Sequence, residues 1–337
     1  MSRNGLLIML SLLAILAAFG QPEAGWVEDG VPISVTNGYK YSPKIIPDGE
    51  GGAIVAWYQA IGSYNIYVQK VDGHGNVKWT VGGLGVCTDP GSQQSPNLVS
   101  DGAGGAIVTW MDYRVADYDI YAQRIDSGGN ILWTADGVPV CEEAGDQLYP
   151  QITTDGAGGA IIAWHDGRGG SVDIFVQRID GNGNEVWFVG GINICWTSGE
   201  QHYPVTVTDE AGGAIVVWED VSAGDGTSKL YAQRVNSSGV TQWTDLGEFV
   251  ASRIFSSSNI KVIPDGASGL IVAWHDYISP SYEVFAQRVS SEGTRMWGDG
   301  VDLTGADPGV QQNPVLVSDG TKGAIIAWRD TRNGDGD

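Results

Sequence analysis

The chain has 337 residues, of which 42 % are hydrophobic, and a formal net charge of −22 at pH 7. This composition is sufficient for a substantial core, and the negative charge excludes nucleic acid and anionic membrane surfaces as partners because both repel it. Its 50 glycines indicate many tight turns, which is typical of a turn-rich β protein.

The first twenty residues have the features of a secretory signal peptide. Arg3 supplies a positive charge before an apolar run, Leu6 to Phe19, that is short for a membrane span. No second apolar run of spanning length follows. The sequence therefore predicts a signal peptide over 1–20 and export. It also predicts a mature chain, 21–337, without a transmembrane segment that is secreted or held at the cell surface.

Tryptophans recur along the chain at a nearly constant spacing. Twelve of the 13 tryptophans fall on two ladders with steps of 53–56 residues, and only Trp196 lies off both. The first ladder follows segments like Gly-Gly-Ala-Ile-Val-Ala and consists of Trp57, Trp110, Trp164, Trp218, Trp274 and Trp328. The second consists of Trp26, Trp79, Trp133, Trp187, Trp243 and Trp297. Such a period indicates a repeat architecture.

Each repeat is predicted to contain four strands. In the unit that begins at 95, these are 96–100 (strand a), 106–111 (strand b), 119–126 (strand c) and a fourth, strand d, that opens at 131–133 and continues through 137–140. Gly-rich turns at 101–105 and 127–130 separate a from b and c from d. The predicted repeats within a single domain are 41–94, 95–148, 149–202, 203–258, 259–312 and a partial 313–337.

Strand b indicates the architecture because both of its faces are apolar. Ala160, Ile162 and Trp164 lie on one face, and Ile161 and Ala163 on the other, so both faces must be covered. A sheet with one exposed face would alternate apolar with polar residues. A short four-stranded sheet that is covered on both sides and repeated about every 54 residues favours an all-β fold, a β-propeller of four-stranded blades.

One unit, at 155–187, carries the pattern DGxGGxIIAWxDxR followed by DIFVQRIDxxGNxxW. This pattern resembles the propeller-like repeats of secreted bacterial surface proteins, and the resemblance covers nearly all of the mature chain. It implies secretion, often together with C-terminal sorting or adhesion modules, and it implies no known reaction.

Both ends of the repeat array are atypical. Residues 26–34 match 133–141 and predict an orphan fourth strand, which would close the ring by completing the last blade. Asp337 aligns with Asp173, just before the apolar part of strand c, so the sixth unit is predicted to lack that strand. We therefore expect the full-length protein to continue with further repeats or with a sorting or anchor module.

Asp and Arg recur directly after strand b in a Trp-x-Asp-x-Arg motif. Two interpretations stay open. A ring of these side chains could bind a polar ligand, or the Asp caps the next loop while the Arg pairs with a carboxylate. Repetition in several blades favours the structural role. The motif occurs at Asp112 with Arg114, Asp166 with Arg168, and Asp330 with Arg332, and Asp220 and Asp276 keep only the Asp.

The loops between strands b and c vary from blade to blade and are rich in tyrosine. Variable loops on a rigid frame are typical of a binding surface, and tyrosine suits glycan or protein ligands. The candidate ligand-binding face comprises Tyr113, Asp112, Arg114, His165, Asp166, Arg168, His275, Asp276 and Tyr277.

No residue pattern indicates a cofactor. Cys87, Cys141 and Cys195 occupy one repeat position at a spacing of 54, so we expect small buried side chains rather than disulfides. The histidines lack zinc-ligand spacing. The acidity is compatible with calcium binding. Asp180-x-Asn182-x-Asn184 resembles the start of a calcium loop, but it lacks the glycine and glutamate that complete one and is predicted to be a hairpin turn.

Two classes of function remain. No nucleophile motif and no catalytic residue set is recognisable, which favours a secreted, non-catalytic propeller that binds a glycan or a protein ligand and argues against an enzyme. The alternative is a propeller-type glycan-cleaving enzyme, a glycosidase or lyase, because scattered carboxylates converge only in the folded ring.

Overall fold

The structure is a computed structural model, and it describes residues 30–221, 228–253, 259–278, 280–305, 309–332 and 334. The predicted signal peptide lies outside these residues. All regular structure in the described part is β: five four-stranded antiparallel sheets and one two-stranded sheet. In each sheet the strands are neighbours in chain order, as in a meander.

The strands have the following bounds. The first sheet has β1 (Lys40–Pro47), β2 (Ala53–Ile61), β3 (Ser63–Val71) and β4 (Leu84–Cys87). The second has β5 (Ser92–Ser100), β6 (Ala106–Tyr113), β7 (Asp119–Ile125) and β8 (Val138–Cys141). The third has β9 (Gln147–Thr154), β10 (Ala160–Asp166), β11 (Asp173–Ile179) and β12 (Ile192–Asn193).

The remaining sheets follow the same order. The fourth has β13 (Gln201–Thr208), β14 (Ala214–Asp220), β15 (Ser228–Val235) and β16 (Glu248–Arg253). The fifth has β17 (Lys261–Pro264), β18 (Leu270–Ile278), β19 (Ser281–Val289) and β20 (Val301–Asp302). The sixth has only β21 (Gln311–Ser318) and β22 (Ala324–Asp330), so within the described residues it has the predicted strands a and b and no strand c.

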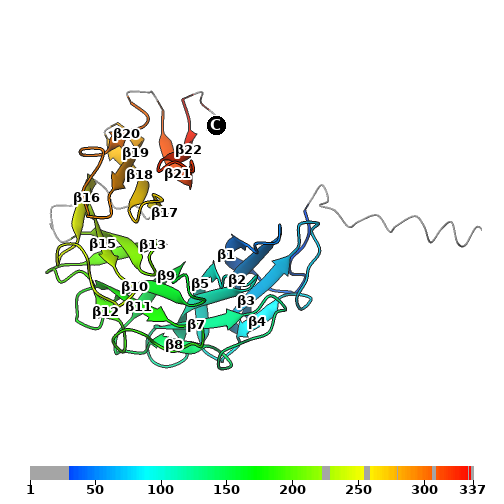
Figure 1. The fold of residues 1–337 in the computed structure, drawn as a ribbon. Helices are drawn as coiled ribbons and strands as arrows, with labels where there is room; N and C mark the ends of the chain where they lie inside the picture. The colour runs from blue at the N-terminus through cyan, green and yellow to red at the C-terminus, as the bar shows by residue number, and fades with distance from the viewer. Residues whose placement is uncertain are drawn as a thin grey trace, which may run out of the picture.

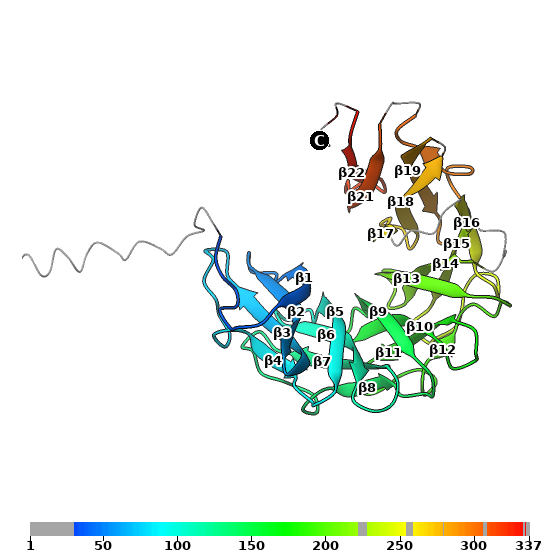
Figure 2. The same cartoon turned by 180° about the vertical axis from the view of Figure 1, so that it is seen from behind.

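The six sheets follow one another along an arc, as blades do around a propeller axis (Figure 1). The first strand of each sheet lies on the inner side of the arc and the fourth on the outer side, as the view from behind also shows (Figure 2). Each first strand contacts the first strand of the next sheet. The predicted all-β propeller of four-stranded blades is therefore confirmed.

The core lies between neighbouring blades. The strand-b tryptophans of the first five blades are at most 2 % exposed. The second ladder joins one blade to the next: the indole Nε1 of Trp79 donates to the carbonyl of Ser127 at 3.2 Å, and Trp133, Trp187 and Trp243 make the equivalent bond. The two apolar faces of strand b are thus covered from both sides.

The fourth strand begins later than predicted. In the second blade, Ile131 forms only an isolated bridge with Ile125, and the strand itself starts at Val138. A turn intervenes, in which the Gly137 amide donates to the carbonyl of Thr134 and Gly137 adopts a φ of 92°, a conformation that favours glycine.

The segment predicted to be an orphan strand forms no strand over residues 30–39. It lies instead against the first blade: the Ser34 hydroxyl donates to the carbonyl of Gly82 at 2.8 Å, and Thr36 bonds the Gln59 side chain. The blue first sheet and the red sixth sheet stand at the two ends of the arc in both views (Figures 1 and 2). Ring closure by residues 26–34 stays a prediction.

Candidate functional site

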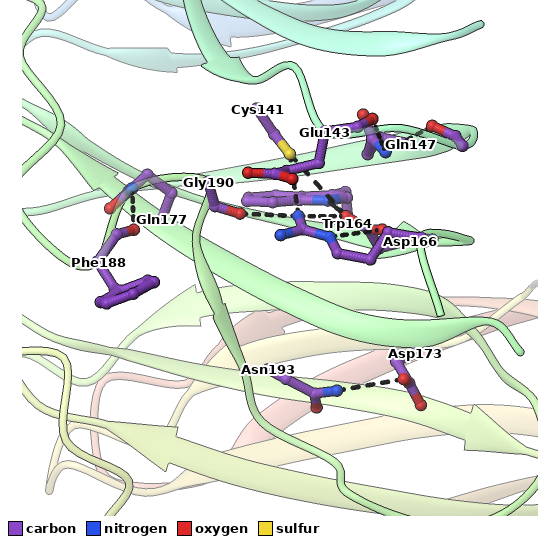
Figure 3. A network of polar contacts seen from close by, with 12 residues as sticks. Cys141, Glu143, Gln147, Trp164, Asp166, Asp173, Gln177, Phe188, Gly190 and Asn193 are labelled. Atoms are coloured by element: carbon purple, nitrogen blue, oxygen red, sulfur yellow. Dashed lines mark hydrogen bonds and ion pairs between the residues drawn. The ribbon is translucent and has the colours of Figure 1, made fainter. Parts of the chain in front are cut away.

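The Trp-x-Asp-x-Arg motif forms a buried network within its own blade. Asp166, which has no exposed surface, accepts hydrogen bonds from Trp164 Nε1 at 2.8 Å and from Arg168 at 2.6 and 2.9 Å. The guanidinium also reaches the Gly190 carbonyl at 2.8 Å and the Cys141 sulfur at 3.0 Å. Figure 3 shows this group, with Asp166 on one side, Gly190 on the other, and Trp164 and Cys141 between them.

The same network recurs with Arg114, Asp112 and Trp110 in the second blade. In the fourth and fifth blades the Arg is missing, and Trp218 Nε1 and Trp274 Nε1 have no hydrogen-bond partner among the described residues. The Arg therefore holds the Asp against the indole. These Asp and Arg side chains serve the packing of each blade and are not brought together into one ligand site.

The other residues of the predicted face are separated as well. Tyr113 is 43 % exposed and packs on Tyr118 of its own loop at 4.9 Å between ring centroids. Tyr277 contacts Tyr282 in the same way at 5.2 Å. Asp276 and His275 are buried, and His275 Nδ1 accepts a bond from the Asn313 amide at 3.2 Å. Of the predicted face, His165 belongs to a cluster of ring side chains drawn from the third and fourth blades.

That cluster arises from a bulge at the start of each inner strand. The register of β9 and of β13 shifts next to a proline, and the residue before the proline takes a positive φ: 53° at Tyr149 and 52° at Tyr203. A bulge turns a side chain out of the regular alternation of the strand. Equivalent bulges occur at Ser42, Ser95 and Asn313.

The bulges bring two tyrosines and two histidines of the third and fourth blades together. The His165 ring lies 4.9 Å from Tyr149, 5.6 Å from His202 and 6.4 Å from Tyr203, measured between ring centroids. His202 Nε2 contacts a carboxylate oxygen of Glu200 at 3.1 Å, and the side chain of His202 remains partly exposed.

Two polar side chains beneath this cluster lack partners. His165 is 5 % exposed, and its Nδ1 has no hydrogen-bond partner among the described residues. Burial, and then repulsion from His202, lower the pKa of His165 to about 4, so its imidazole is neutral at pH 7. Glu219 is cross-strand partner to His202 and fully buried, and neither of its carboxylate oxygens has a partner in the described part of the chain. Buried polar groups without partners are rare in proteins.

His165 and Glu219 occupy the same place in their repeats, directly after the strand-b tryptophan. We call this place the rim position, and its six residues are Tyr58, Met111, His165, Glu219, His275 and Arg329. The flanking residues of strand b are nearly constant, whereas the rim position changes chemical type in almost every blade. Structural roles repeat from blade to blade, so this variation indicates function.

Beside the cluster lies a cavity of about 710 Å³ on the inner side of the arc. Tyr149 and Tyr203 line it, together with residues one place after the strand-a proline, which is replaced by Ile260 in the fifth blade. We call this second place the inner-ring position, and its six residues are Lys44, Asn97, Gln151, Val205, Lys261 and Val315. Five of the six line the cavity, and Asn97 joins the ring by donating to the Gln151 side chain at 3.0 Å.

No group of three or more His, Cys, Asp or Glu residues in the described ranges is arranged to hold a metal ion. Asp180, considered above as the start of a calcium loop, accepts the Asn182 and Asn184 amides at 2.8 and 2.9 Å and closes a hairpin turn. The three cysteines are free and buried, and burial raises the pKa of the Cys87 and Cys141 thiols to about 12. In the part of the chain described, no helix is long and apolar enough to span a membrane.

Sequence reasoning missed Tyr149, Tyr203, His202, Glu219 and the two inner-ring lysines. A signal was present in the repeats themselves. When the repeats are aligned on the strand-b tryptophan, residue types change at the rim position of strand b and at the inner-ring position of strand a, while the residues that flank these two positions vary less. The b–c loops vary more, but their tyrosines pair within each loop.

No protein-family model matches the chain, and no curated protein sequence matches it. Solved structures match it by fold. A polysaccharide lyase described as an ulvan lyase bound to -[GlcA(1-4)Rha3S]- has a TM-score of 0.56 at 12 % identity, with 91 % of this chain and 81 % of that chain covered. The α-L-arabinofuranosidase of Fusarium graminearum in complex with arabinobiose has a TM-score of 0.52 at 9 % identity, with 91 % of this chain and 94 % of that chain covered.

These comparisons correct the functional expectation. The sequence favoured a non-catalytic binding or scaffold propeller and argued against an enzyme, whereas both of these structures are of glycan-cleaving enzymes. The finding favours the alternative, a propeller-type glycan-cleaving enzyme. At this level of identity the likeness shows the β-propeller fold alone, which is what the chain shares with them.

Proposed function

We propose that this chain is a propeller-type glycan-cleaving enzyme whose active site is the inner cavity beside His202. One observation carries the proposal. A partly exposed histidine, His202, is paired with Glu200 and packs against Tyr203, which with Tyr149 lines a cavity of about 710 Å³ on the inner side of the propeller arc. Ligand sites are concave and combine aromatic walls with a few polar groups.

The arrangement supplies the groups needed for proton transfer. A carboxylate at one ring nitrogen orients an imidazole and leaves the other nitrogen to accept a proton from a substrate. Glu200 holds His202 in this way. Tyr203 and Tyr149 offer ring faces for a sugar and hydroxyls for a hydrogen bond or a proton. The buried, neutral His165 packs behind the tyrosines and keeps their rings in place.

Export through the segment 1–20 belongs to the same proposal, because polymeric glycans lie outside the cell. The features of a signal peptide in that segment support it.

The test is cleavage of polysaccharides by the purified protein. A panel of neutral and acidic polymers is incubated with the protein, and new chain ends are measured. We expect His202→Asn to reduce kcat by about 100-fold or more, the usual contribution of a general base. His74→Asn, in an exposed turn of the first blade, is the matched control and should keep full activity.

Circular dichroism must show that both variants are folded. Absence of cleavage on every polymer by the wild-type protein, or equal activity of the wild-type and His202→Asn proteins, would contradict the proposal.

A further inference from the structure

Two lysines at equivalent repeat positions meet at the inner cavity. Lys44 of β1 and Lys261 of β17 both occupy the inner-ring position, both line the cavity and both have exposed side chains. Neither forms an ion pair with a carboxylate of the described residues. By contrast, the four strand-c arginines each pair with a buried Asp, at distances of 2.8–3.1 Å: Arg124, Arg178, Arg234 and Arg288.

The charged side chains that line the cavity are positive, although the net charge of the whole chain is negative. The protein carries a net charge of −22, yet no Asp or Glu is among the residues that line this cavity. Loss of hydration in the cavity, and then repulsion from Lys261, lower the pKa of Lys44. Two ammonium groups that line one cavity and repel each other, with no carboxylate beside them on its wall, form a site that an anion stabilises.

We propose that the cavity binds an acidic glycan through Lys44 and Lys261, which hold the carboxylate of a uronic acid, and that the chain is cleaved there by β-elimination. This inference rests on the proposed function, because it names the substrate and the reaction of the same site.

The step balances without a co-reactant. The lysines neutralise the uronate carboxylate, which makes the adjacent C5 proton more acidic. His202 takes this proton, the electron pair forms a double bond between C4 and C5, and the bond from C4 to the glycosidic oxygen breaks. The departing oxygen receives a proton from a tyrosine hydroxyl, that of Tyr149 or Tyr203. The two products are a chain with a new reducing end, which keeps the departing oxygen, and a chain with an unsaturated uronic acid at its non-reducing end.

Hydrolysis would require other residues. It uses two carboxyl groups that flank the bond, one as acid and one as base or nucleophile. Of the two glutamates near this cavity, Glu200 is bonded to His202 and Glu219 is fully buried, and no carboxylate is among the residues that line the wall, whereas His202 packs directly behind the lining Tyr203. Lysines, tyrosines and a histidine suit elimination better.

The first experiment measures binding, in the full chain carrying His202→Asn so that the ligand stays intact. The probes are a polyuronate and the same polymer with its carboxylates chemically reduced to alcohols, titrated by calorimetry. We expect only the polyuronate to bind, with an affinity that falls as salt rises. Lys44→Gln and Lys261→Gln should each weaken it about tenfold. Lys229→Gln, exposed on β15, should leave it unchanged.

The second experiment measures cleavage by the wild-type protein, followed by the ultraviolet absorbance of the unsaturated product. Equal binding of the two polymers, or full binding by both cavity variants, overturns the inference. Cleavage of neutral glycans without an unsaturated product overturns it as well, while the proposed function stands. Charge-dependent binding without cleavage of any polymer overturns the elimination step and the proposed function together, and leaves only the acidic-glycan site.

Discussion

Asp166 has no exposed surface and accepts hydrogen bonds from three donor groups. Without these partners, its buried charge would strongly destabilise the folded state. The Arg168 guanidinium neutralises it, Trp164 Nε1 donates a hydrogen bond to one of its oxygens at 2.8 Å, and the Arg168 backbone amide donates to the other at 3.0 Å. Breaking a buried pair by removing one partner is strongly destabilising, because the desolvated charge remains.

We therefore expect Arg168→Met to lower the free energy of unfolding by about 3–5 kcal/mol, measured by urea denaturation. Arg332→Met is the matched control. That arginine is 42 % exposed and pairs with Asp330 near the surface, so its loss should cost about 1 kcal/mol or less. Equal effects of the two substitutions would show that burial does not decide the strength of this motif.

The lowered pKa of His165 predicts how the stability of the fold depends on pH. Its pKa falls from 6.5 in the unfolded chain to about 4 in the folded protein. The unfolded state therefore binds one more proton between these values, and stability is lost as the pH falls from about 6.5 to about 4. This one group accounts for about 3 kcal/mol of that loss.

His165→Met, which introduces the residue found at the rim position of the second blade, should remove that part of the pH dependence. The measurement is urea unfolding of both proteins at several pH values. An unchanged slope of stability against pH would show that His165 does not titrate below its ordinary range.

At the scale of the element, the turn between the first two strands of a blade keeps the same Asp and Gly residues in every repeat. Asp155 accepts the amides of Ala157 and Gly159 at 2.8 Å on one oxygen and Arg178 on the other. A Cβ at Gly159 would lie 2.2 Å from the Ile179 carbonyl oxygen, so no side chain fits there. The same Asp and Gly recur in all six blades, and in the first five a strand-c carbonyl passes this close to the glycine.

Gly159→Ala should therefore destabilise the protein by about 2–3 kcal/mol through overpacking. Gly169→Ala, in the next loop, is the control, since a Cβ there meets nothing within 4 Å and the backbone φ is not positive. The comparison uses midpoints of thermal unfolding. A smaller effect at Gly159 than at Gly169 would contradict the packing argument.

Much of the fold follows from features that repeat. The tryptophan period, the two apolar faces of 160–164 and the Gly-rich turns predict the blades and their first three strands. The residues of the candidate site differ from blade to blade, so the repeat pattern does not reveal them. Lys44 and Lys261 share no motif with Asn97 or Val205, and only the arc of blades brings the first and fifth inner strands to one cavity. Tyr149 and Tyr203 reach it through a bulge that no pattern of apolar residues encodes.

At the scale of the whole molecule, the sixth sheet leaves apolar surface uncovered. Ile325 and Val317 are cross-strand partners on β22 and β21 and are 63 % and 61 % exposed. Their equivalents in the third blade, Ile161 and Thr153, are buried by the neighbouring blade. Within the described residues no third strand pairs with β22, so this edge also carries unpaired backbone groups.

We expect the 337-residue chain to self-associate through this edge. Sedimentation velocity should show larger species as the protein concentration rises, and Ile325→Lys should suppress them. Val81→Lys, 81 % exposed at the far end of the arc, should have no such effect. A wild-type chain that stays monomeric over the whole concentration range would refute the expectation.

The hydrogen bond from each outer tryptophan to the next blade has a consequence for cooperativity. Since the backbone amides of Trp79, Trp133 and their equivalents bond within their own blade and their indoles bond the following blade, the energetic coupling that they provide is between nearest neighbours. Arrays of this kind unfold from their ends, because an end unit has one interface and an interior unit has two. Amide protons of β21 and β22 should therefore exchange with solvent fastest, and those of the third blade slowest. The blades around His202 and Tyr149 lie in the slow middle of the array, where the structure holds a site most rigidly.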